Sequence, residues 1–421
     1  MTDSERHFDV VVVGAGPAGL AAACAAAECG RNVGVADETP WLGGQIWRGQ
    51  AKLANPQARA WIERARSSGV TWLDRTTVIG APEKRLLLAE HPDGPRVIGW
   101  KRLILATGAR ELFLPFPGWT LPGIVGPGGL LALVKNGWPA AGKRVVVAGS
   151  GPLLLAVASG LKQKGARIVS IGEQAPLSKL GAFGLQLVWH PGKLWQGLGC
   201  KFLLAGVRYR SGVWPVCAEG DEQVRQVTLT DGRKTWSEEC DLLACGFHLT
   251  PNVELPLALG CELCAGFVKV DEWQETSVAE VYCAGEPTGI GGADCALSEG
   301  QIAGYAAGDQ RTKAQARFGK RAGWHRFRKA MAETFALRAE LRTLAKDDTL
   351  LCRCEDVTLG CVKRFHGWRE AKLQTRCGMG ACQGRVCGGA AKAIFGWGME
   401  SVRPPVLPAR VQHLILTTND Q

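Results

Sequence analysis

The first strong pattern in the chain is an unbroken apolar run, Val10 to Val13, that leads directly into glycines. Such a run is typical of a parallel strand that is buried on both faces. Small residues from Ala18 to Cys29 then predict a closely packed helix, and Asn32 to Ala36 predict a second strand that ends at Asp37. The order strand, glycine-rich turn, helix and strand predicts a βαβ nucleotide-binding unit.

The middle of the chain repeats this plan about 135 residues later. A strand at Arg144 to Ala148 meets a second glycine-rich turn, and a helix rich in Leu and Ala follows. The next strand, Arg167 to Ile171, ends near Glu173. Segments that resemble the rest of the first unit lie on both sides of this repeat, at Leu103 to Ala109 and Thr276 to Glu286. The second unit is therefore predicted to be inserted into the first.

We predict an α/β fold with two Rossmann-like dinucleotide-binding domains, the second inserted in the first, and a small α-rich module at the C-terminus. Cysteines and glycines concentrate in that module, and a tail with Pro404, Pro405 and Pro408 follows it and is expected to pack back on the body. The predicted parts are a first nucleotide domain (1–111 and 248–310), a second one (112–247), a basic helical linker (311–348), and the cysteine module with its tail (349–421).

Composition places the chain among globular proteins, with 421 residues, 46% hydrophobic and 21% charged. No stretch approaches 18 consecutive apolar residues, and the N-terminus lacks the pattern of a signal peptide. We expect a cytoplasmic protein, with peripheral attachment at the inner membrane as the alternative. In that compartment most of the 16 cysteines should be reduced thiols, so an organised cysteine cluster indicates metal binding.

The net charge of +11 is concentrated in one segment. Between Arg311 and Lys346 the chain has eleven Lys or Arg residues and two acidic ones, Glu333 and Glu340. Nucleic-acid binding is one interpretation of such a segment, but no recognised nucleic-acid-binding motif accompanies the charge. We therefore expect a basic helical linker that lies on an acidic partner or on the protein's own surface.

The first glycine-rich turn, Gly14-Ala15-Gly16-Pro17-Ala18-Gly19, has the spacing of a dinucleotide-binding fingerprint. Its first glycine makes the tight turn, its second lets a pyrophosphate approach the backbone, and its third lets helix and strand pack closely. The helix N-terminus favours the phosphate charge. Asp37 stands where a carboxylate accepts hydrogen bonds from a ribose.

Three further segments resemble the two-dinucleotide-domain flavoproteins and favour FAD over NAD at this site. They are Leu42-Gly43-Gly44-Gln45, Ala106-Thr107-Gly108, and Thr276-Ser277 with Tyr282 to Glu286. In this family the acid of the last motif contacts the ribityl chain, and here that acid is Glu286 in place of the usual Asp. The FAD-binding residues implied are Gly14, Gly16, Pro17, Ala18, Gly19, Asp37, Glu38, Gly43, Gly44, Gln45, Arg48, Ala106, Thr107, Gly108, Gly285 and Glu286.

The second glycine-rich turn is incomplete, because it keeps Gly149 and Gly151 but has Leu154 at the third position. Glu173 stands in place for a ribose and disfavours a 2′-phosphate. Three interpretations stay open for Gly149, Gly151 and Glu173: binding of NAD(H), binding of another adenine nucleotide such as ATP, and a structural remnant.

Disulfide reductases of this general type use a redox Cys-x-x-Cys beside the flavin, and the sequence has one pair with that spacing, Cys261 and Cys264. Residues three apart on a strand do not share a face. We expect a structural role for these two cysteines, and no disulfide reduction.

The C-terminal module has two close cysteine pairs, Cys352-x-Cys354 and Cys382-x4-Cys387. Four thiolates are the ligand set of a [2Fe–2S] cluster, with one pair for each iron. Gly378, Gly380 and Gly384 would let backbone N–H groups reach the sulfurs, and Arg376 and Arg385 would balance the negative charge. Structural zinc is the alternative, although Cys-x-Cys is closer than the usual zinc spacing. A fifth cysteine, Cys377, could replace Cys382.

Taken together, Gly43 to Arg48, Gly149 to Leu154 and above all Thr375 to Cys387 resemble the α subunits of heteromeric, dye-linked amine dehydrogenases. That family includes D-hydroxyproline dehydrogenase, opine oxidase, L-proline dehydrogenase and the flavin subunit of hydrogen cyanide synthase. The C-terminal module resembles the bacterioferritin-associated-ferredoxin type of [2Fe–2S] domain. The resemblance favours Cys352, Cys354, Cys382 and Cys387 as the cluster ligands.

The resemblance implies a division of labour. A separate β flavoprotein oxidises an amino or imino acid, and the α subunit passes the electrons on through FAD and [2Fe–2S]; a small ferredoxin-like γ subunit is an optional partner. FMN at the α–β contact is implied for some members. No substrate-oxidising constellation stands out here, and the histidines considered for the flavin face, His190 and His248, are isolated. The alternatives are a self-sufficient NAD(H):acceptor flavin oxidoreductase and a zinc-bearing docking subunit.

Overall fold

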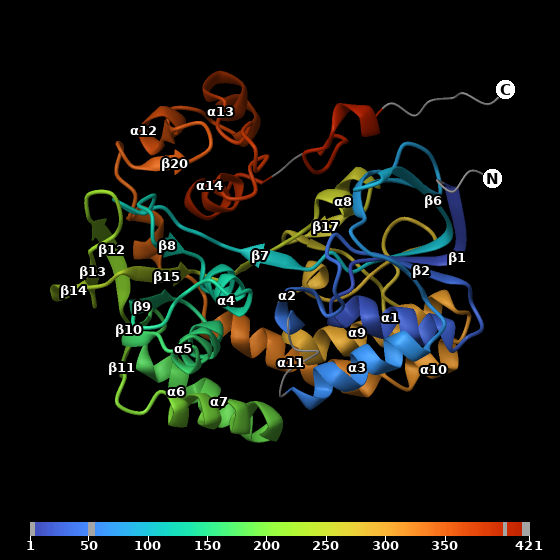
Figure 1. The fold of residues 1–421 in the computed structure, drawn as a ribbon, viewed down its shortest axis with the longest axis horizontal. Coiled ribbons are helices and arrows are strands. Elements are labelled where there is room, and N and C mark those ends of the chain that lie inside the picture. Colours follow the sequence, from blue (N-terminus) through green and yellow to red (C-terminus); the bar gives the residue numbers. More distant parts are fainter. Residues whose placement is uncertain (1–4, 49–54, 399–401, 415–421) are drawn as a thin grey trace. The chain divides into compact units, whose positions relative to one another are not determined.

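The computed structural model describes residues 5–48, 55–398 and 402–414, and the chain divides into two compact units. The first unit comprises 1–110, 251–328 and 401–421, and the second comprises 111–250 and 329–400. Figure 1 labels their elements. The longer segment of the second unit, 111–250, begins within β7 (Ala109–Glu111) and ends within β16 (Leu249–Pro251). These two strands pair with each other in a two-stranded sheet. This segment interrupts the sequence of the first unit, as the inserted repeat leads one to expect.

The first unit is built on a seven-stranded sheet with the order β3-β2-β1-β6-β5-β4, and β19 pairs with β6. Strand β1 pairs in parallel with β2 and β6, so the buried valines of Val10 to Val13 form the middle of the sheet. The two flanking segments predicted to complete this unit supply β6 and β19. The strands are β1 (Glu5–Val13), β2 (Val33–Ala36), β3 (Thr71–Leu73), β4 (Thr77–Gly80), β5 (Leu86–His91), β6 (Gly94–Leu105) and β19 (Val281–Cys283).

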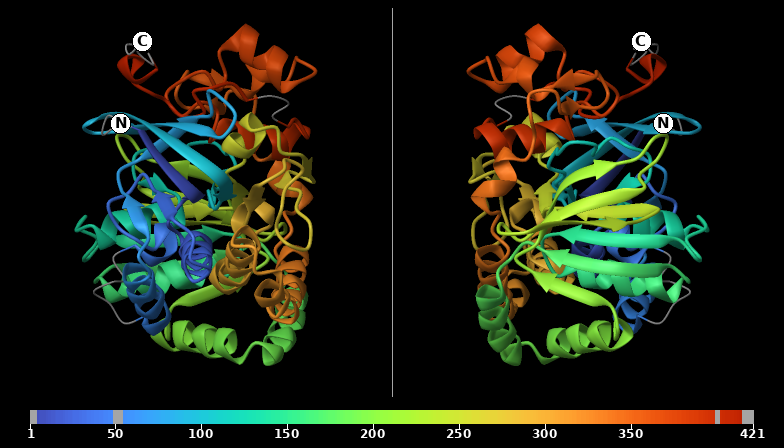
Figure 2. Two further views of the ribbon diagram at one scale, coloured as in Figure 1. Left: turned by 90° about the vertical axis from the view of Figure 1, so that its right-hand side faces the viewer. Right: turned by 90° about the vertical axis from the view of Figure 1, so that its left-hand side faces the viewer.

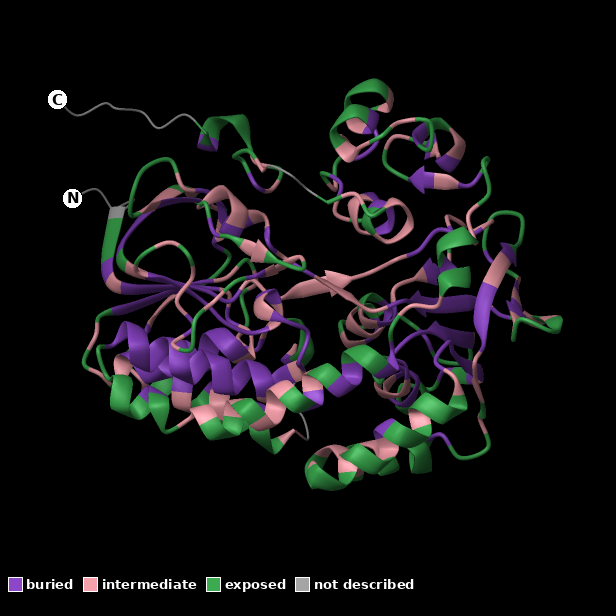
Figure 3. Ribbon diagram, turned by 180° about the vertical axis from the view of Figure 1, so that it is seen from behind, coloured by how far each residue is buried: buried purple, intermediate pink, exposed green. Residues whose placement is uncertain are grey.

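Two helices made of small residues pack closely in this unit, α1 (Pro17–Ala27) and α9 (Gly292–Ala307). A Cβ at Gly300 would lie 2.1 Å from the carbonyl oxygen of Ala18, so only glycine allows this approach. Both helices are almost wholly buried (Figure 3). The unit also contains α2 (Gly44–Trp47), α3 (Pro56–Ser67), α8 (Glu254–Ala258), β17 (Leu263–Cys264), β18 (Phe267–Val268), η3 (Glu286–Thr288) and α10 (Arg311–Gln315).

The second unit is built on a five-stranded sheet with the order β11-β10-β9-β15-β8. Strands β9 and β10, joined by α5, form the second βαβ unit that the sequence predicted, and they pair in parallel. A separate antiparallel sheet holds β12, β13 and β14. The elements are β8 (Ile124–Val125), α4 (Pro127–Lys135), β9 (Arg144–Gly149), α5 (Leu153–Gln163), β10 (Arg167–Glu173), α6 (Leu177–Gln186), η2 (Leu187–Trp189), α7 (Pro191–Leu203), β11 (Arg208–Ser211), β12 (Trp214–Glu219), β13 (Gln226–Thr230), β14 (Thr235–Glu239) and β15 (Leu242–Gly246).

The cysteine module belongs to the second unit and has a small apolar core of its own. The indole N–H of Trp119 donates to the carbonyl of Leu350 at 2.6 Å, which ties the module to the inserted segment. Its elements, with the preceding 3-10 turn, are η4 (Ala339–Thr343), β20 (Leu350–Cys352), β21 (Val357–Thr358), α12 (Leu359–Val362), α13 (Trp368–Thr375) and α14 (Cys387–Phe395).

The described part of the tail packs on the first unit, whereas the sequence-based division grouped it with the cysteine module. Val406 is buried in the first unit's core, and its N–H donates to the carbonyl of Ile79 at 2.7 Å. His413, at the end of η5 (Val411–His413), contacts Glu90 at 2.9 Å. The sequence-based division differs from the observed one because Val406, a single valine among prolines, gives no indication in the sequence that it packs in the first unit's core beside Ile79.

The basic segment contacts its own chain, within each unit, at several points. It forms α10, α11 (Phe318–Thr334) and η4, and the division between the two units falls inside it, between Arg328 and Lys329. Arg321 donates to the side chain of Gln274, Arg328 pairs with Glu299, and the Arg338 guanidinium stacks on Trp214. These three arginines thus have partners within the chain. Across the described residues, no helix combines the length and the apolar content that a membrane span needs.

Candidate functional site

The first glycine loop leaves β1 at Gly14 and enters α1 at Pro17, and each of its glycines has a different environment. Gly14 has a φ of +103°, and a Cβ there would lie 2.3 Å from the carbonyl oxygen of Ala106. A Cβ at Gly19 would lie 1.8 Å from the carbonyl oxygen of Gly14. Nothing lies within 4 Å of a Cβ at Gly16. Gly14 and Gly19 are therefore required by packing, while the space beside Gly16 is open to a ligand.

Asp37 stands at the end of β2, where its carboxylate faces the glycine loop. It accepts hydrogen bonds from the backbone N–H of Ala15 at 2.6 Å and from that of Thr39 at 2.8 Å. The side chain is half-buried. These bonds hold the carboxylate beside the loop, in the place of a ribose-binding acid. Glu38 beside it is exposed.

The turn that the sequence assigned to the flavin abuts the same loop. The N–H of Gly43 donates to the carbonyl of Ala15 at 2.9 Å, and a Cβ at Gly44 would lie 2.8 Å from the Cα of Gly16. Gln45 is exposed on the short helix α2 that follows. Arg48 ends this turn, and its Nε is buried with no hydrogen-bond partner in the described part of the chain. A buried guanidinium N–H without a partner suits a bound anion such as a phosphate.

The Ala106-Thr107-Gly108 segment continues β6 and fixes the end of the sheet. The hydroxyl of Thr107 donates to the carbonyl of Asn252 at 2.7 Å, and the amide of Asn252 donates back to the carbonyl of Thr107 at 2.9 Å. The N–H of Ala106 donates to the carbonyl of Val13 at 2.9 Å. These bonds place the crossover motif directly beside the glycine loop.

Glu286 begins η3, and its carboxylate accepts hydrogen bonds from the N–H groups of Gly291 and Gly292, at the start of α9, at 2.9 and 3.0 Å. Burial raises the pKa of Glu286 to about 7. Gly285 precedes it with a φ of +85°, and a Cβ there would lie 2.9 Å from the Cβ of Ala18. The closing motif and the glycine loop thus meet, as the flavoprotein resemblance implies.

A buried carboxylate that the sequence analysis did not single out supports this motif. Glu299 is 1% exposed and accepts from the N–H of Gly285 at 2.9 Å and from the hydroxyl of Thr288 at 2.9 Å. His325 contacts the other carboxylate oxygen at 2.8 Å, and Arg328 lies 3.3 Å from that oxygen. The sequence signal that could have identified this residue is that Glu299 is the one glutamate among the small residues of α9. Glu299 fixes the turn that carries Glu286.

The second glycine loop has the backbone of a nucleotide loop. Gly149 has a φ of +140°, and a Cβ there would lie 1.7 Å from the carbonyl oxygen of Gly246. Leu154, at the position of the missing third glycine, is buried. Glu173 accepts from the N–H groups of Gly151 at 2.7 Å and Ala175 at 2.8 Å. Burial raises the pKa of Glu173 to about 7.

The second loop is nevertheless covered by the chain that follows α11. The hydroxyl of Ser150 donates to the carbonyl of Phe335 at 3.1 Å. The amide of Gln174 donates to Ser150 and to the carbonyl of Ala336, and it accepts from the N–H of Arg338. The residues of this second loop and its acid are all buried: Gly149, Ser150, Gly151, Glu173 and Gln174. By contrast, Gly14, Gly16 and Asp37 of the first loop are half-exposed.

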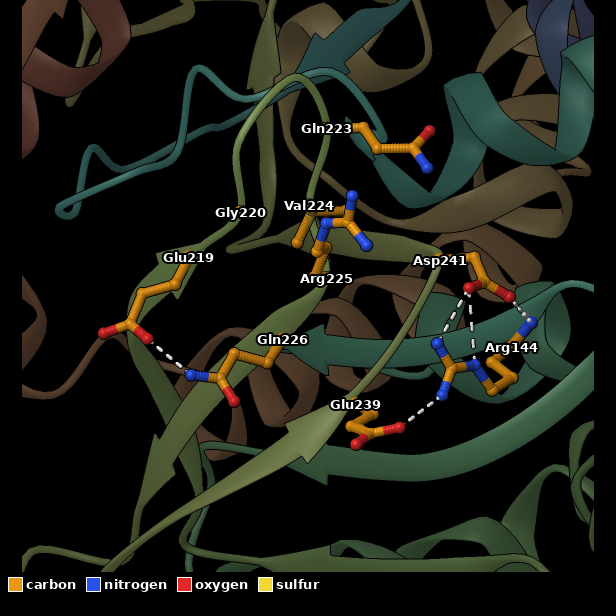
Figure 4. Close-up of a pocket in the computed structure, with 9 residues that line it drawn as sticks. All are labelled: Arg144, Glu219, Gly220, Gln223, Val224, Arg225, Gln226, Glu239 and Asp241. Atoms are coloured by element: carbon orange, nitrogen blue, oxygen red, sulfur yellow. Dashed lines mark hydrogen bonds and ion pairs between the residues drawn. The ribbon is translucent and has the colours of Figure 1, made fainter.

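A surface pocket in the second unit lies at the other end of strand β9 (Figure 4). It is lined by charged residues, among them Arg144, which pairs with Asp241 at 3.0 Å and with Glu239 at 2.6 Å. Arg144 begins β9, while ligands of parallel sheets bind where the strands end. The position of this pocket therefore does not match a nucleotide site.

Five cysteines gather in the C-terminal module. The sulfurs of Cys352, Cys377 and Cys387 lie within 4.8 Å of one another. Cys382 hydrogen-bonds Cys387 and Cys354. All four predicted ligands are thus brought together, and Cys377 joins them.

The surroundings of two of these thiols, Cys352 and Cys382, favour thiolates, whereas hydrogen bonds to Cys352 raise the pKa of Cys377 and Cys387, and the pKa of Cys354 is raised as well. The N–H of Gly378 donates to the sulfur of Cys352 at 3.5 Å. Hydrogen bonds from Cys377 and Cys387 hold the pKa of Cys352 far below its usual range, and a hydrogen bond from Cys387 lowers the pKa of Cys382 to about 5. Thiolates are the form that binds metal. The donor set therefore fits an iron–sulfur or zinc centre.

Arginine contacts in the module differ from the expected pairing with cluster charge. Arg376 pairs with Glu355 at 2.7 Å and is largely exposed. Arg385 donates to the carbonyl of Cys382 at 3.3 Å, which holds the loop between the second pair of cysteines. Arg376 was expected to balance the charge of a cluster, but its guanidinium pairs with the carboxylate of Glu355, a partner 21 residues away that only the folded chain brings close.

Other candidates are separate from these sites. Cys261 is buried and bonds Thr276, while Cys264 is exposed, so the two do not present a paired dithiol. His248 accepts from the N–H of Leu249 at 2.8 Å, and His190 precedes α7. Both histidines belong to the unit that does not contain the first glycine loop.

Comparison with known proteins agrees with this geometry. Residues 8–300 match the model of a family described as pyridine nucleotide-disulphide oxidoreductase. The chain belongs to this family. The prediction of an FAD-dependent oxidoreductase with a Rossmann-like parallel sheet is thereby confirmed.

Relatives of similar length extend the match to almost the whole chain. The chain is 31% identical to the A chain of opine oxidase from Rhizobium meliloti (strain 1021), over 95% of this chain and 97% of that protein. It is 31% identical to the HcnB subunit of hydrogen cyanide synthase from Pseudomonas protegens, over 90% of each. The crystal structure of L-proline dehydrogenase from P. horikoshii has the same fold, with a TM-score of 0.70 at 21% identity over 98% of this chain and 80% of that one.

Proposed function

We propose that this chain is the electron-transfer subunit of a multi-subunit dehydrogenase that acts on an amino or imino acid of the D-hydroxyproline or opine type. A partner β flavoprotein would oxidise the substrate, and this chain would relay the electrons through FAD and a [2Fe–2S] cluster. The observation that carries the proposal is one chain with a complete flavin loop and a cluster of five thiols. Relatives that match over nearly their full length are named as subunits, which supports a heteromeric assembly.

The flavin loop provides the binding groups for FAD. The open backbone at Gly16 would accept the pyrophosphate, Asp37 would accept hydrogen bonds from the ribose, and the unpartnered Nε of Arg48 would donate to an anion. Glu286 would orient the ribityl chain from the start of α9. FAD, when bound, takes up two electrons together and releases them one at a time. The Cys-x-x-Cys pair of the first unit has one buried and one exposed cysteine, Cys261 and Cys264, so disulfide reduction is not the proposed outlet.

The cysteine cluster provides the ligands of the second centre. Cys352, Cys354, Cys382 and Cys387 would bind the two irons, and the Gly378 N–H would donate to a ligand sulfur and raise the potential. The structure also places Cys377 near Cys352 and Cys387, so the choice between Cys377 and Cys382 needs an experiment.

Iron and acid-labile sulfide content, with electron paramagnetic resonance of the anaerobically reduced chain, test this centre. We expect two irons and two sulfides per chain and a rhombic signal. Cys354→Ser and Cys382→Ser should lose the cluster, while Cys377→Ser should keep it with at most a shifted signal. Stoichiometric zinc without iron would establish the docking alternative and overturn the proposal.

Co-expression tests the division of labour. The isolated chain should not oxidise D-hydroxyproline or an opine, and the complex with a β flavoprotein partner should do so. Full activity of the isolated chain would contradict the proposal. Its natural gene neighbours would show whether a flavin-oxidase-like frame and a small ferredoxin-like frame accompany it.

The alternative of a self-sufficient NAD(H) oxidoreductase requires an accessible second nucleotide loop. The hydrogen bonds from Ser150 and Gln174 to the Phe335–Ala336 backbone favour a structural role for that loop. Anaerobic mixing of the flavin-loaded chain with NADH should therefore leave the flavin oxidised. Rapid bleaching of the flavin would support the alternative.

A further inference from the structure

The connection between β10 and β11 has an unusual distribution of apolar residues. It consists of α6, η2 and α7, here called the crossover segment (177–203), and it joins two parallel neighbouring strands. Crossover helices of parallel sheets normally bury their apolar side on the sheet. Here a set of large apolar side chains is exposed, and we call it the outer apolar face: Leu177, Leu185, Val188, Trp189, Trp195, Leu198 and Phe202.

The exposure is high and follows helical spacing. Trp189 is 84% exposed, Trp195 72% and Phe202 83%. Trp195, Leu198 and Phe202 are spaced i, i+3 and i+7, so they lie on one side of α7. Two aromatic side chains on one helix face, both more than two-thirds exposed, are uncommon on a soluble surface.

The opposite side of the segment is the one that holds it to the second unit. Phe183 is buried and makes an edge-on contact with Phe335, with ring centroids 5.4 Å apart. On α7, Leu194, Gly197 and Cys200 are half-buried, on the side away from the exposed face. Figure 2 shows the two helices on the outside of this unit, and in Figure 3 most of their residues have the colours of exposed or intermediate positions. The fold is therefore satisfied without the outer apolar face, which is available to something else.

Within the crossover segment and its sequence neighbours the charge has one sign, and the nearby acidic residue Glu333 of α11 accepts a hydrogen bond at its carbonyl from the Nζ of Lys179 at 3.3 Å. From Gln174 to Arg210 the sequence contains five Lys or Arg residues and no Asp or Glu. Lys179 and Lys201 are exposed on α6 and α7. Protein interfaces are depleted in lysine, whereas helices that lie on membranes combine Lys or Arg with Trp, Phe and Leu. Tryptophan in particular prefers the boundary between headgroups and acyl chains.

We infer that the crossover segment is a monotopic membrane-binding element whose occupant is a lipid surface that contains anionic headgroups. The outer apolar face enters the headgroup and acyl boundary, and Lys179 and Lys201 lie among the anionic headgroups. The helices lie in the plane of the interface and do not cross the bilayer. This inference does not rest on the proposed electron-transfer function.

Vesicle flotation of the flavin-loaded full-length chain tests the inference. We expect it to float with phosphatidylcholine vesicles that contain phosphatidylglycerol, and to bind pure phosphatidylcholine much more weakly. Raising the salt concentration to about 1 M should reduce binding roughly tenfold or more. The tryptophan emission should shift to shorter wavelength on binding, as Trp189 and Trp195 leave water.

Two variants separate the apolar and charged contributions. Trp189→Ser with Trp195→Ser and Phe202→Ser should abolish flotation, while flavin content and circular dichroism stay unchanged. Lys179→Gln with Lys201→Gln, a mild surface change, should weaken binding roughly tenfold to thirtyfold. Trp138→Ser with Leu373→Ser is the matched control, because these exposed apolar residues lie outside the segment and should not affect flotation.

Three results would overturn the inference. They are no flotation with anionic vesicles at low salt, unchanged flotation of the triple serine variant, and equal loss in the matched control. A partner subunit is the competing occupant of this face. If the wild type did not float and the serine variant also failed to co-purify with a co-expressed β flavoprotein, the face would be a subunit interface and the inference would be wrong.

Discussion

At the scale of single residues, the three glycines of the first loop have separable tasks. A Cβ at Gly19 would collide with the carbonyl of Gly14, and a Cβ at Gly14 would collide with that of Ala106. Gly16 has an ordinary φ of −72° and open space beside it. Two of these positions therefore serve the fold, and the third leaves open space beside the loop.

Gly16→Ala should uncouple flavin binding from folding. We expect the apoprotein to keep its unfolding free energy, because the methyl group meets no neighbour, while FAD per purified chain falls strongly, because the methyl occupies the pyrophosphate's approach. Gly19→Ala should instead destabilise the apoprotein by about 1–3 kcal/mol or prevent folding. Urea unfolding of the apoproteins and flavin extraction measure the two effects. Full flavin content in Gly16→Ala would place the pyrophosphate elsewhere.

Asp37 and Glu173 occupy equivalent places in the two repeats but differ in burial. Both accept a hydrogen bond from a loop N–H, and both end the second strand of a βαβ unit. Asp37 is half-buried, whereas Glu173 is 1% exposed. The sequence predicted both acids as ribose-binding candidates, but only the folded surroundings decide which of the two carboxylates is accessible.

Glu173 should make stability fall as pH rises. Its pKa is about 7 in the folded chain against a usual value of 4.5, so the folded state binds the proton more tightly than the unfolded state. The unfolding free energy should therefore decrease between about pH 4.5 and pH 7, by up to about 3 kcal/mol, and then level off. Glu173→Gln should lose this contribution and show a shallower slope, while Glu286, whose pKa is also about 7, keeps its own. Denaturant unfolding at about pH 5 and pH 8 compares the two, and parallel profiles would show that Glu173 is not buried as described.

At the scale of elements, the stretch after α11 decides what the second loop can do. Ser150 and Gln174 lie more than 150 residues before Phe335 in the sequence, and their bonds to it form only in the folded unit. The degenerate Gly-x-Gly pattern left nucleotide binding open, since two of its three glycines are present. The hydrogen bonds from Ser150 and Gln174 to the backbone of Phe335 and Ala336 show that this loop is covered, which the sequence pattern could not indicate.

Gln174→Leu should weaken the second unit. The substitution removes a fully buried amide that donates to the carbonyls of Phe335 and Ala336 and accepts from the Arg338 N–H, and it leaves Ser150 as the remaining donor to the Phe335 carbonyl. We expect a loss of about 2–4 kcal/mol in unfolding free energy. Gln186→Leu is the control, because Gln186 is exposed on α6. A loss below about 0.5 kcal/mol would mean that the segment does not bind the loop in solution.

At the scale of the whole molecule, the two proposed centres divide between the two units. The residues proposed to bind FAD all belong to the first unit, and the five clustered cysteines all belong to the second. Each unit has its own core around its own sheet. A ligand of one unit should therefore stabilise that unit alone.

Calorimetry of the apoprotein should show two unfolding transitions. Added FAD should raise the temperature of one of them, by a free energy of about 3 kcal/mol at a hundredfold excess over its dissociation constant. Reconstitution of the cluster should raise the other. Limited proteolysis during heating would assign each transition to a unit. A shift of both transitions by FAD would mean that the units unfold together.

The sequence by itself determined the local features. The spacing of Gly14, Gly16 and Gly19, the acids at Asp37 and Glu173, and the paired cysteines follow from steric and chemical requirements that act within a few residues. Buried valine runs and small-residue helices likewise predicted the two repeats, because burial of a strand or helix face leaves a periodic pattern.

Tertiary structure decided everything that depends on which distant segments meet. It covered the second loop with Phe335 and Ala336, added Cys377 to the thiol cluster, and joined Glu299 to His325 and to the turn of Glu286. It also turned one apolar side of α7 outward, although the spacing of Trp195, Leu198 and Phe202 is equally typical of a buried face. Periodicity tells which side chains share a face, and only the folded neighbours determine whether that face is covered.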